Sequence, residues 1–506
     1  MTAPRGGVTA RPDIVRGALR DGAWNVAALG LPGVANIIIV AILIRTLGPE
    51  GFAPWAAAIG LLGVLTILDG GLSTTIARDV ARARAGDLAA LDLVRAAMGA
   101  YAIIGALVLG GGIGLSLALP SLLGVSGAGA TSVVTLAAIL AGDFAVVVAT
   151  GGWLGALRGA RRFDLVFAAN ATQVAVAVPM TLVLVPGLGL VGAASAQVAG
   201  RLLGRAVAAI ALRRVLPSVP IVVVGLSGRA FRRVGAFTIP VLAITVSTHL
   251  GVGIDPVIVA ASSGAVAVGL YAAGAGLVRY LAFLLFPVLG VLLPAFSGLA
   301  VESAHAAPAT LIRCVRLGAL VGGLAFGTLA VGASDALTVW IGRSDQLSVE
   351  VLVLYAVAHA LWTPSQVMIL MLIARGQHGL VGTLLLSNAV LNALVSIALA
   401  YVIGPVGVAV GTLVFLAIVH VAVIPALVVR RIGISAAQLV TALATGFGPA
   451  GAIVIAAGLI PVDGMLGLLV RGGVALGAAA VGLAVDQLAA GRSASGIDLR
   501  PDEARS

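Results

Sequence analysis

This chain contains no lysine, a single cysteine and few charged residues. All 30 basic residues among its 506 are arginine, and charged residues make up 10% of the total. A Walker A phosphate loop and Schiff-base chemistry both need a lysine amine, so the composition argues against ATP hydrolysis and lysine-based catalysis. The lone Cys314 excludes an internal disulfide and any metal site built from several cysteines.

The remaining residue types offer no replacement catalytic chemistry. The sequence has no G-x-S-x-G or H-E-x-x-H pattern, and its five histidines lack the spacing of metal ligands. We therefore expect no catalytic residues, no metal and no cofactor, and a protein that is not an enzyme. Any energy that the protein uses must then come from an ion gradient, the membrane potential or the gradient of a substrate.

Long apolar runs are what the chain has in excess. Hydrophobic residues make up 60% of the chain, and the mean hydropathy is +1.17. Runs of about 20 apolar residues match the length at which a helix crosses ~30 Å of hydrocarbon. Since unbroken runs favour helices over barrel strands, the sequence predicts an all-α membrane protein with about fourteen transmembrane helices, at residues 22–44, 52–75, 96–119, 131–156, 165–185, 188–211, 233–253, 265–287, 311–332, 350–374, 380–402, 405–428, 439–459 and 464–485.

The arginines predict how these helices are oriented. Most of them fall in alternate loops on one side, and an excess of basic residues marks the cytoplasmic side. Arg201 and Arg205 fall in this cytoplasmic set, together with the arginines of the loop that follows the sixth helix. We expect a multi-pass protein of the bacterial inner (plasma) membrane with both termini in the cytoplasm. The net charge of +11 then sets orientation and indicates no nucleic-acid partner.

An internal repeat divides the predicted helices. A shift of about 216 residues aligns three places, namely Gly48–Ala57 with Gly264–Ala273, Arg158-Gly159 with Arg375-Gly376, and Gly189-x-x-Gly192 with Gly404-x-x-Gly407. Six helices per copy is an even number, so the two copies enter the membrane in the same sense. Such parallel repeats predict two lobes that bind substrate between them and expose it to each side in turn.

The repeat sets the predicted domain boundaries. They are a cytoplasmic tail (1–21), an N-terminal lobe of helices 1–6 (22–214), a cytoplasmic linker (215–232), a C-terminal lobe of helices 7–12 (233–431), helices 13 and 14 (432–488) and a disordered cytoplasmic tail (489–506).

Polar groups inside membrane spans are costly and are therefore candidates for function. Arg279 lies deep in the eighth predicted helix, where a guanidinium suits a phosphate or pyrophosphate, or a structural ion pair with a carboxylate such as Asp143. Asn36 and His249 are further candidates for substrate binding. Both also fit a packing role, as an interhelical hydrogen bond and as a core histidine.

Other polar residues suggest coupling and gating. Asp143 and His359 are candidates for carrying a proton or cation, because burial shifts the pKa of such groups. The alternatives are an ion pair for Asp143 and a satisfied core position for His359. Asp69 and Arg78, near the cytoplasmic end of the second helix, are candidates for a gate that closes by an ion pair. Asp69 also fits a solvated helix end.

Residues 44–81 resemble the opening helices of Wzx-type polysaccharide flippases. The resemblance rests on L-G-P-E-G-F (47–52) and on Asp69, Gly71, Leu72 and Arg78, and it extends to I-D-P-V-I-V-A (254–260) and V-G-L-Y-A-A-G (268–274). It implies the multidrug/oligosaccharidyl-lipid/polysaccharide exporter superfamily. Such a protein moves an undecaprenyl-pyrophosphate-linked oligosaccharide from the inner to the outer leaflet for surface polysaccharide biosynthesis. Arg279, the one clear intramembrane arginine, would meet the pyrophosphate.

The resemblance also implies partner molecules, and three alternative functions are weighed against it. Implied partners are the lipid-linked glycan, membrane lipids and a polymerase or glycosyltransferases of the same pathway. A multidrug exporter of the superfamily is expected to have an acidic residue in helix 1, where this chain has Asn25 and Asn36. A peptidoglycan-precursor flippase is expected to have more arginines in its cavity. A polysaccharide polymerase or ligase needs a large external loop, whereas the longest here is 333–349.

Overall fold

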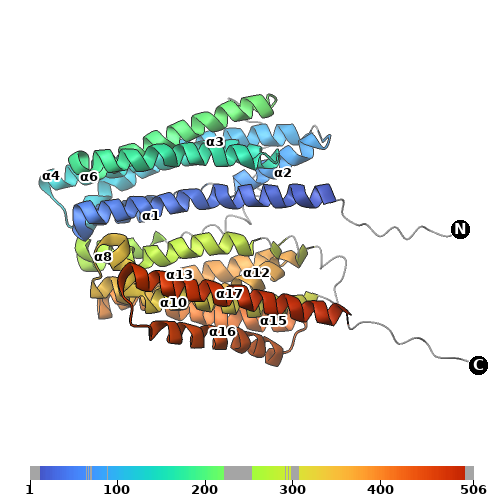
Figure 1. Ribbon diagram of the computed structural model, residues 1–506. Coiled ribbons are helices and arrows are strands. Elements are labelled where there is room, and N and C mark those ends of the chain that lie inside the picture. Colours follow the sequence, from blue (N-terminus) through green and yellow to red (C-terminus); the bar gives the residue numbers. More distant parts are fainter. Residues whose placement is uncertain are drawn as a thin grey trace, which may run out of the picture. The chain divides into compact units, whose positions relative to one another are not determined.

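The computed structural model describes residues 12–63, 65, 68, 71–87, 89–221, 253–290, 292–293, 296–297 and 307–495, and in these ranges every regular element is a helix (Figure 1). The predicted all-α class is therefore confirmed. The helices are α1 (Pro12–Gly63), α2 (Leu72–Arg84), α3 (Ala89–Leu122), α4 (Gly127–Ala149), α5 (Gly151–Gly159), α6 (Phe163–Val215), α8 (Asp255–Leu289), α10 (Ala307–Val331), α11 (Ala333–Ile341), α12 (Gln346–Ala374), α13 (His378–Ile403), α14 (Pro405–Ala417), the π-helix η2 (Ile418–Val423), α15 (Ile424–Ile432), α16 (Ala436–Gly458) and α17 (Gly464–Ser495).

Eleven helical stretches among the described residues are long and apolar enough to cross a membrane. The shortest has 23 residues and the longest 53, against the ~20 that a span requires. The two longest helices, α1 and α6, each join two helices across a kink. Most of the predicted span 233–253 lies outside the described residues, so the total of fourteen stays a prediction. The chain is a multi-pass membrane protein.

Four glycines with positive φ interrupt the helical backbone in matched pairs. Gly48 (φ 72, ψ 172) corresponds to Gly264 (φ 77, ψ 179), and Gly189 (φ 54, ψ −137) corresponds to Gly404 (φ 72, ψ −158). Glycine adopts such angles without the steric penalty of a side chain. The predicted repeat aligns these same two pairs, and the backbone conformation recurs at both of them.

A close backbone approach follows each member of the second pair. A Cβ atom at Gly192 would lie 2.7 Å from the carbonyl oxygen of Leu184, and one at Gly407 would clash with the carbonyl oxygen of Leu399. Leu184 and Leu399 are themselves equivalent positions of the repeat. The two turns therefore share both their backbone angles and their packing.

The chain forms two compact units, each assembled from segments distant in sequence. The first comprises Met1–Val288 with Gln377–Thr412, and the second comprises Leu289–Gly376 with Leu413–Ser506. The predicted lobes, 22–214 and 233–431, and the predicted tails and linker stay predictions.

Small residues bring α3 and α4 close together in the first unit. In α3, Cβ atoms at Gly105 and Gly112 would lie 2.7 Å from the methyl carbons of Ala149 and Ala141 on α4. Lipid is as apolar as a leucine side chain, so membrane helices associate mainly through close van der Waals packing. Glycine and alanine at these positions provide that packing.

Ion pairs hold α17, the last helix that the structure describes, against α10 and α11 of the second unit. Near the end of α17, the buried carboxylate of Asp486 accepts hydrogen bonds from both Arg313 and Arg316 of α10. Nearer its start, Arg471 donates to Asp335 of α11 at 2.7 Å. Two separate charge-assisted contacts therefore hold α17 along its length.

Candidate functional site

Arg279, the main sequence candidate for substrate contact, lies in α8 with a half-buried side chain. The next residue, Tyr280, accepts a hydrogen bond of 3.0 Å at its hydroxyl oxygen from Nδ2 of Asn36 in α1. The structure thus places two of the predicted substrate residues, Asn36 and Arg279, on one pair of helices within the first unit.

Glycines on α1 allow this helix pair to come together. Gly30, Gly33 and Asn36 are spaced three residues apart, which puts them on one side of the helix. A Cβ atom at Gly33 would lie 2.7 Å from Cδ1 of Phe283, and one at Gly30 would lie 3.7 Å from Leu284. Bare backbone at Gly33 therefore makes room for the ring of Phe283, one turn beyond Tyr280.

Asp143, the proposed ion carrier, forms a buried ion pair. Asp143 is 4% exposed, and the two oxygens of its carboxylate accept hydrogen bonds from Nε and a terminal nitrogen of Arg201 at 2.9 and 2.8 Å. The other terminal nitrogen of Arg201 donates to the amide oxygen of Gln173 at 3.3 Å. The pairing weighed for Asp143 from sequence, with Arg279, is thus made instead with Arg201.

The turn within α6 brings Arg201 beside Gln173, a contact that no local sequence pattern indicates. The helix turns back at Gly189, and Cβ atoms at Gly200 and Gly204 would lie 2.5 Å from the carbonyl oxygens of Gln173 and Ala169 in its first half. The second half is thus a packed helix that runs to Val215.

The expectations for Arg201 and Arg205 need correction. The charge pattern places both in a cytoplasmic loop, whereas both lie within α6. Arg201 comes fourteen residues before Val215, about 21 Å along the helix axis. Arg279 is therefore not the one arginine within a helix long enough to cross a membrane. The predicted span 188–211 already contains both residues. Their place inside a helix is obscured when they are counted with the loop arginines that set the orientation.

His359, the other candidate ion carrier, is 4% exposed in α12. Its Nδ1 lies 2.8 Å from the carbonyl oxygen of Tyr355, one turn earlier. Its ring centroid lies 5.5 Å from that of Phe326 and 5.2 Å from that of Trp362. These contacts match the alternative weighed from sequence, a satisfied core histidine, and a proton-carrying role stays a prediction.

A second buried histidine, His420, also packs near Trp362. His420 belongs to the π-helix η2, and its ring centroid is 5.7 Å from that of Trp362. Its Nδ1 lies 2.8 Å from the hydroxyl oxygen of Ser365 in α12. Two imidazoles therefore pack near one indole ring in the second unit.

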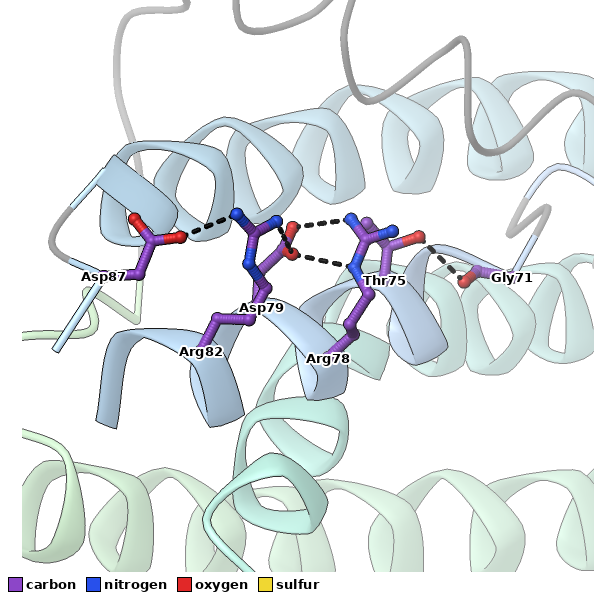
Figure 2. A network of polar contacts seen from close by, with 6 residues as sticks. All are labelled: Gly71, Thr75, Arg78, Asp79, Arg82 and Asp87. Atoms are coloured by element: carbon purple, nitrogen blue, oxygen red, sulfur yellow. Dashed lines mark hydrogen bonds and ion pairs between the residues drawn. The ribbon is translucent and has the colours of Figure 1, made fainter. Parts of the chain in front are cut away.

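Figure 2 shows the surroundings of Arg78, the gating candidate on α2. Its guanidinium donates to both oxygens of Asp79, at 2.8 and 3.1 Å, and Arg82 approaches the same carboxylate at 3.6 Å. Asp79 is 1% exposed, and sequence analysis passed over it. Asp69, the predicted gating partner, and His249, the third substrate candidate, lie outside the described residues.

The guanidinium and carboxylate groups described above are of the kinds that bind ions. Within the described part of the chain, no group of three or more His, Cys, Asp or Glu residues could hold a metal ion. Guanidinium groups can bind anions through paired hydrogen bonds, and a buried carboxylate can exchange a proton or cation. Such groups can bind and release charged ligands.

Comparison with solved structures shows the fold. A multidrug resistance MATE family transporter of the MOP superfamily, in an inward-facing conformation, aligns with a TM-score of 0.64 at 16% identity, over 85% of this chain and 98% of that one. The lipid II flippase MurJ, in an inward closed conformation, aligns with a TM-score of 0.69 at 10% identity, over 92% of this chain and 97% of that one. The chain thus shares the architecture of these transporters.

Sequence comparison adds the family. A stretch of 63 residues is 35% identical to a Shigella flexneri protein named "Putative O-antigen transporter", although it spans 12% of this chain and 15% of that relative. The family model described as "Polysaccharide biosynthesis protein" matches residues 18–300. The match covers more than half of the chain and includes the motifs on which the flippase resemblance rests. The chain belongs to the polysaccharide biosynthesis protein family of membrane transporters, whose members are not enzymes.

Proposed function

We propose that this protein moves a lipid-linked oligosaccharide, carried on undecaprenyl pyrophosphate, from the inner to the outer leaflet of the bacterial plasma membrane. The flipped glycan serves cell-surface polysaccharide biosynthesis. The observation that carries the proposal is the family match over residues 18–300, which includes a membrane helix with the half-buried Arg279.

The chemistry of Arg279 supports an anionic substrate. A guanidinium in a membrane span is costly, so it is retained where it meets a partner of opposite charge. A planar fork of N–H donors fits the oxygens of a pyrophosphate better than a point charge does. Asn36 and Tyr280, which are hydrogen-bonded to each other beside it, supply neutral polar groups, and His249 is a further candidate for substrate contact.

Coupling and gating are assigned to other residues in this proposal. The buried Asp143 and its partner Arg201 are the best placed to respond to a proton or cation, and His359 is the second candidate. Asp69 and Arg78 belong to the cytoplasmic gate, in which Asp79 now has a part. A polymerase and glycosyltransferases of the same pathway are the expected protein partners.

Replacing Arg279 tests the proposal. Deleting the gene should trap the lipid-linked glycan in the cytoplasmic leaflet, measured as glycan protected from an external glycosidase in right-side-out vesicles. Wild-type protein should restore exposure. Arg279→Ala should not restore it, because the anion-binding fork is lost. Arg213→Ala is the matched control, since it removes an exposed guanidinium in the last turn of α6, and it should restore most of the exposure.

Two results would contradict the proposal. Arg279→Ala that restores glycan exposure as well as wild type would leave Arg279 with a structural role only. Normal surface glycan after deletion, together with greater sensitivity to cationic drugs, would favour a multidrug exporter instead.

A further inference from the structure

A close backbone contact joins α1 and α8, which belong to different copies of the internal repeat, within the first unit. A Cβ atom at Gly269 of α8 would overlap the carbonyl oxygen of Pro49 in α1. At the other end of this segment of α1, a Cβ atom at Gly60 would lie 2.7 Å from the carbonyl oxygen of Gly253, just before α8. The two copies therefore meet backbone to backbone, at positions where a side chain would clash.

The contacting segments occupy equivalent places in the two copies. The segment of α1 begins directly after the turn at Gly48, and Gly269 follows the turn at Gly264. At the repeat offset of 216 residues, Trp55 corresponds to Tyr271, and these large side chains are 3% and 0% exposed. Equivalent stretches of both copies are thus buried, and they touch each other.

A contact of this kind is tight without being strongly bonded. Van der Waals packing and the approach of a glycine Cα–H group to a carbonyl oxygen are each weak. Separating a buried ion pair such as Asp143 and Arg201, in contrast, would leave two charges without compensation. The contact of Gly269 with Pro49 by itself opens at little cost, which suits a contact between repeat copies that move against each other.

We infer that the contact of α1 with α8 at Gly60 and Gly269 is a gate, which closes the protein on the face where the Gly48 and Gly264 turns lie. The arginine pattern predicts that this face is external. The two glycines let the copies approach closely enough to exclude water, and opening separates the same segments. The inference rests on the alternating exposure in the proposed function, but not on the identity of the cargo.

Cysteine accessibility tests the gate in the full-length protein. Val268, which is fully buried beside Gly269, is changed to a similarly small apolar cysteine (Val268→Cys) in a Cys314→Ser background. A membrane-impermeant maleimide is added to right-side-out vesicles and to inverted vesicles. Val268→Cys should react in right-side-out vesicles only, because the open gate exposes it to the outside. Val108→Cys, equally buried in α3, is the matched control and should react in neither.

Gly269→Ala should raise the labelling rate of Val268→Cys roughly tenfold, because the added methyl group overlaps Pro49 and shifts the population toward the open state. Gly110→Ala on α3, where a Cβ atom would meet no atom within 4 Å, should leave the rate unchanged. If Val268→Cys does not insert into the membrane, Ala273→Cys, at a position of α8 that is 1% exposed, supplies the same comparison.

Three results would overturn the inference. They are a Val268→Cys protein that is as unreactive as Val108→Cys, reaction of Val268→Cys from the cytoplasmic side, and a labelling rate that Gly269→Ala leaves unchanged. The readout is cysteine labelling, whereas the Arg279 test follows glycan exposure. Failure of the gate is therefore distinguishable from failure of the proposed function.

Discussion

Asp143 and Arg201 show how a charge is accommodated inside these helices. The carboxylate is 6% exposed and the guanidinium 18%, and two hydrogen bonds of 2.8 and 2.9 Å join them. Removing one member of a buried ion pair leaves the other without compensation, which costs more than the pair contributes. A structural role and a coupling role for Asp143 therefore predict different outcomes for single and double variants.

We expect Asp143→Asn and Arg201→Gln each to destabilise the protein by about 3 to 5 kcal/mol, and the double variant to recover most of that loss. Unfolding midpoints of the purified proteins in detergent provide the measurement. If Asp143 also couples transport to an ion gradient, the double variant regains stability but not gradient-driven transport in proteoliposomes. Additive losses in the double variant would mean that the pair is not coupled.

At the scale of the element, glycine turns set the geometry of the long helices. Gly189 and Gly404 combine positive φ with ψ of −137° and −158°, a region that residues with a side chain rarely adopt. The turn at Gly189 lets the second half of α6 pack on the first, which buries Arg201 beside Gln173. A substitution at Gly189 should therefore also disturb the packing of Arg201, which lies more than one helical turn away.

We predict that Gly189→Ala and Gly404→Ala each lower the unfolding free energy by about 1 to 3 kcal/mol, because alanine is strained at these angles. Gly187→Ala is the matched control, since Gly187 lacks positive φ and a Cβ atom there would meet no atom within 4 Å. Unfolding midpoints in one detergent compare the three variants. Equal effects at Gly187 and Gly189 would contradict the backbone explanation.

At the scale of the whole molecule, the arginines still predict the orientation. Arg201 and Arg205 lie within α6, so they are left out when the loop arginines are counted. The clusters at Arg78/Arg82/Arg84/Arg95 and at Arg158/Arg161/Arg162 keep the bias on the same side. The prediction that both termini face the cytoplasm therefore does not depend on α6.

Reporter fusions check this orientation. Alkaline phosphatase folds only outside the cytoplasm, so a fusion after Ser126, between α3 and α4, should be active. A fusion after Arg161, between α5 and α6, should be inactive, and green fluorescent protein at the C-terminus should fluoresce. The reverse pattern would invert the predicted topology and place the clusters on the external side.

The sequence by itself determined the fold class, the places of most helices and the positions of the repeated turns. Apolar runs must become helices in a membrane, because the backbone can satisfy its hydrogen bonds there in few other ways. The turns at Gly48, Gly189, Gly264 and Gly404 were predictable because each depends on the residue itself and its immediate neighbours.

Only the tertiary structure decided which polar groups meet. Asp143 and Arg201 are 58 residues apart, and Asn36 and Tyr280 are 244 apart, so no local pattern connects them. The partner of a buried charge depends on the rotation and depth of two helices, which close packing of small residues sets. The sequence therefore makes Asp143 and Asn36 candidates but names neither partner, and it leaves Arg201 among the loop arginines.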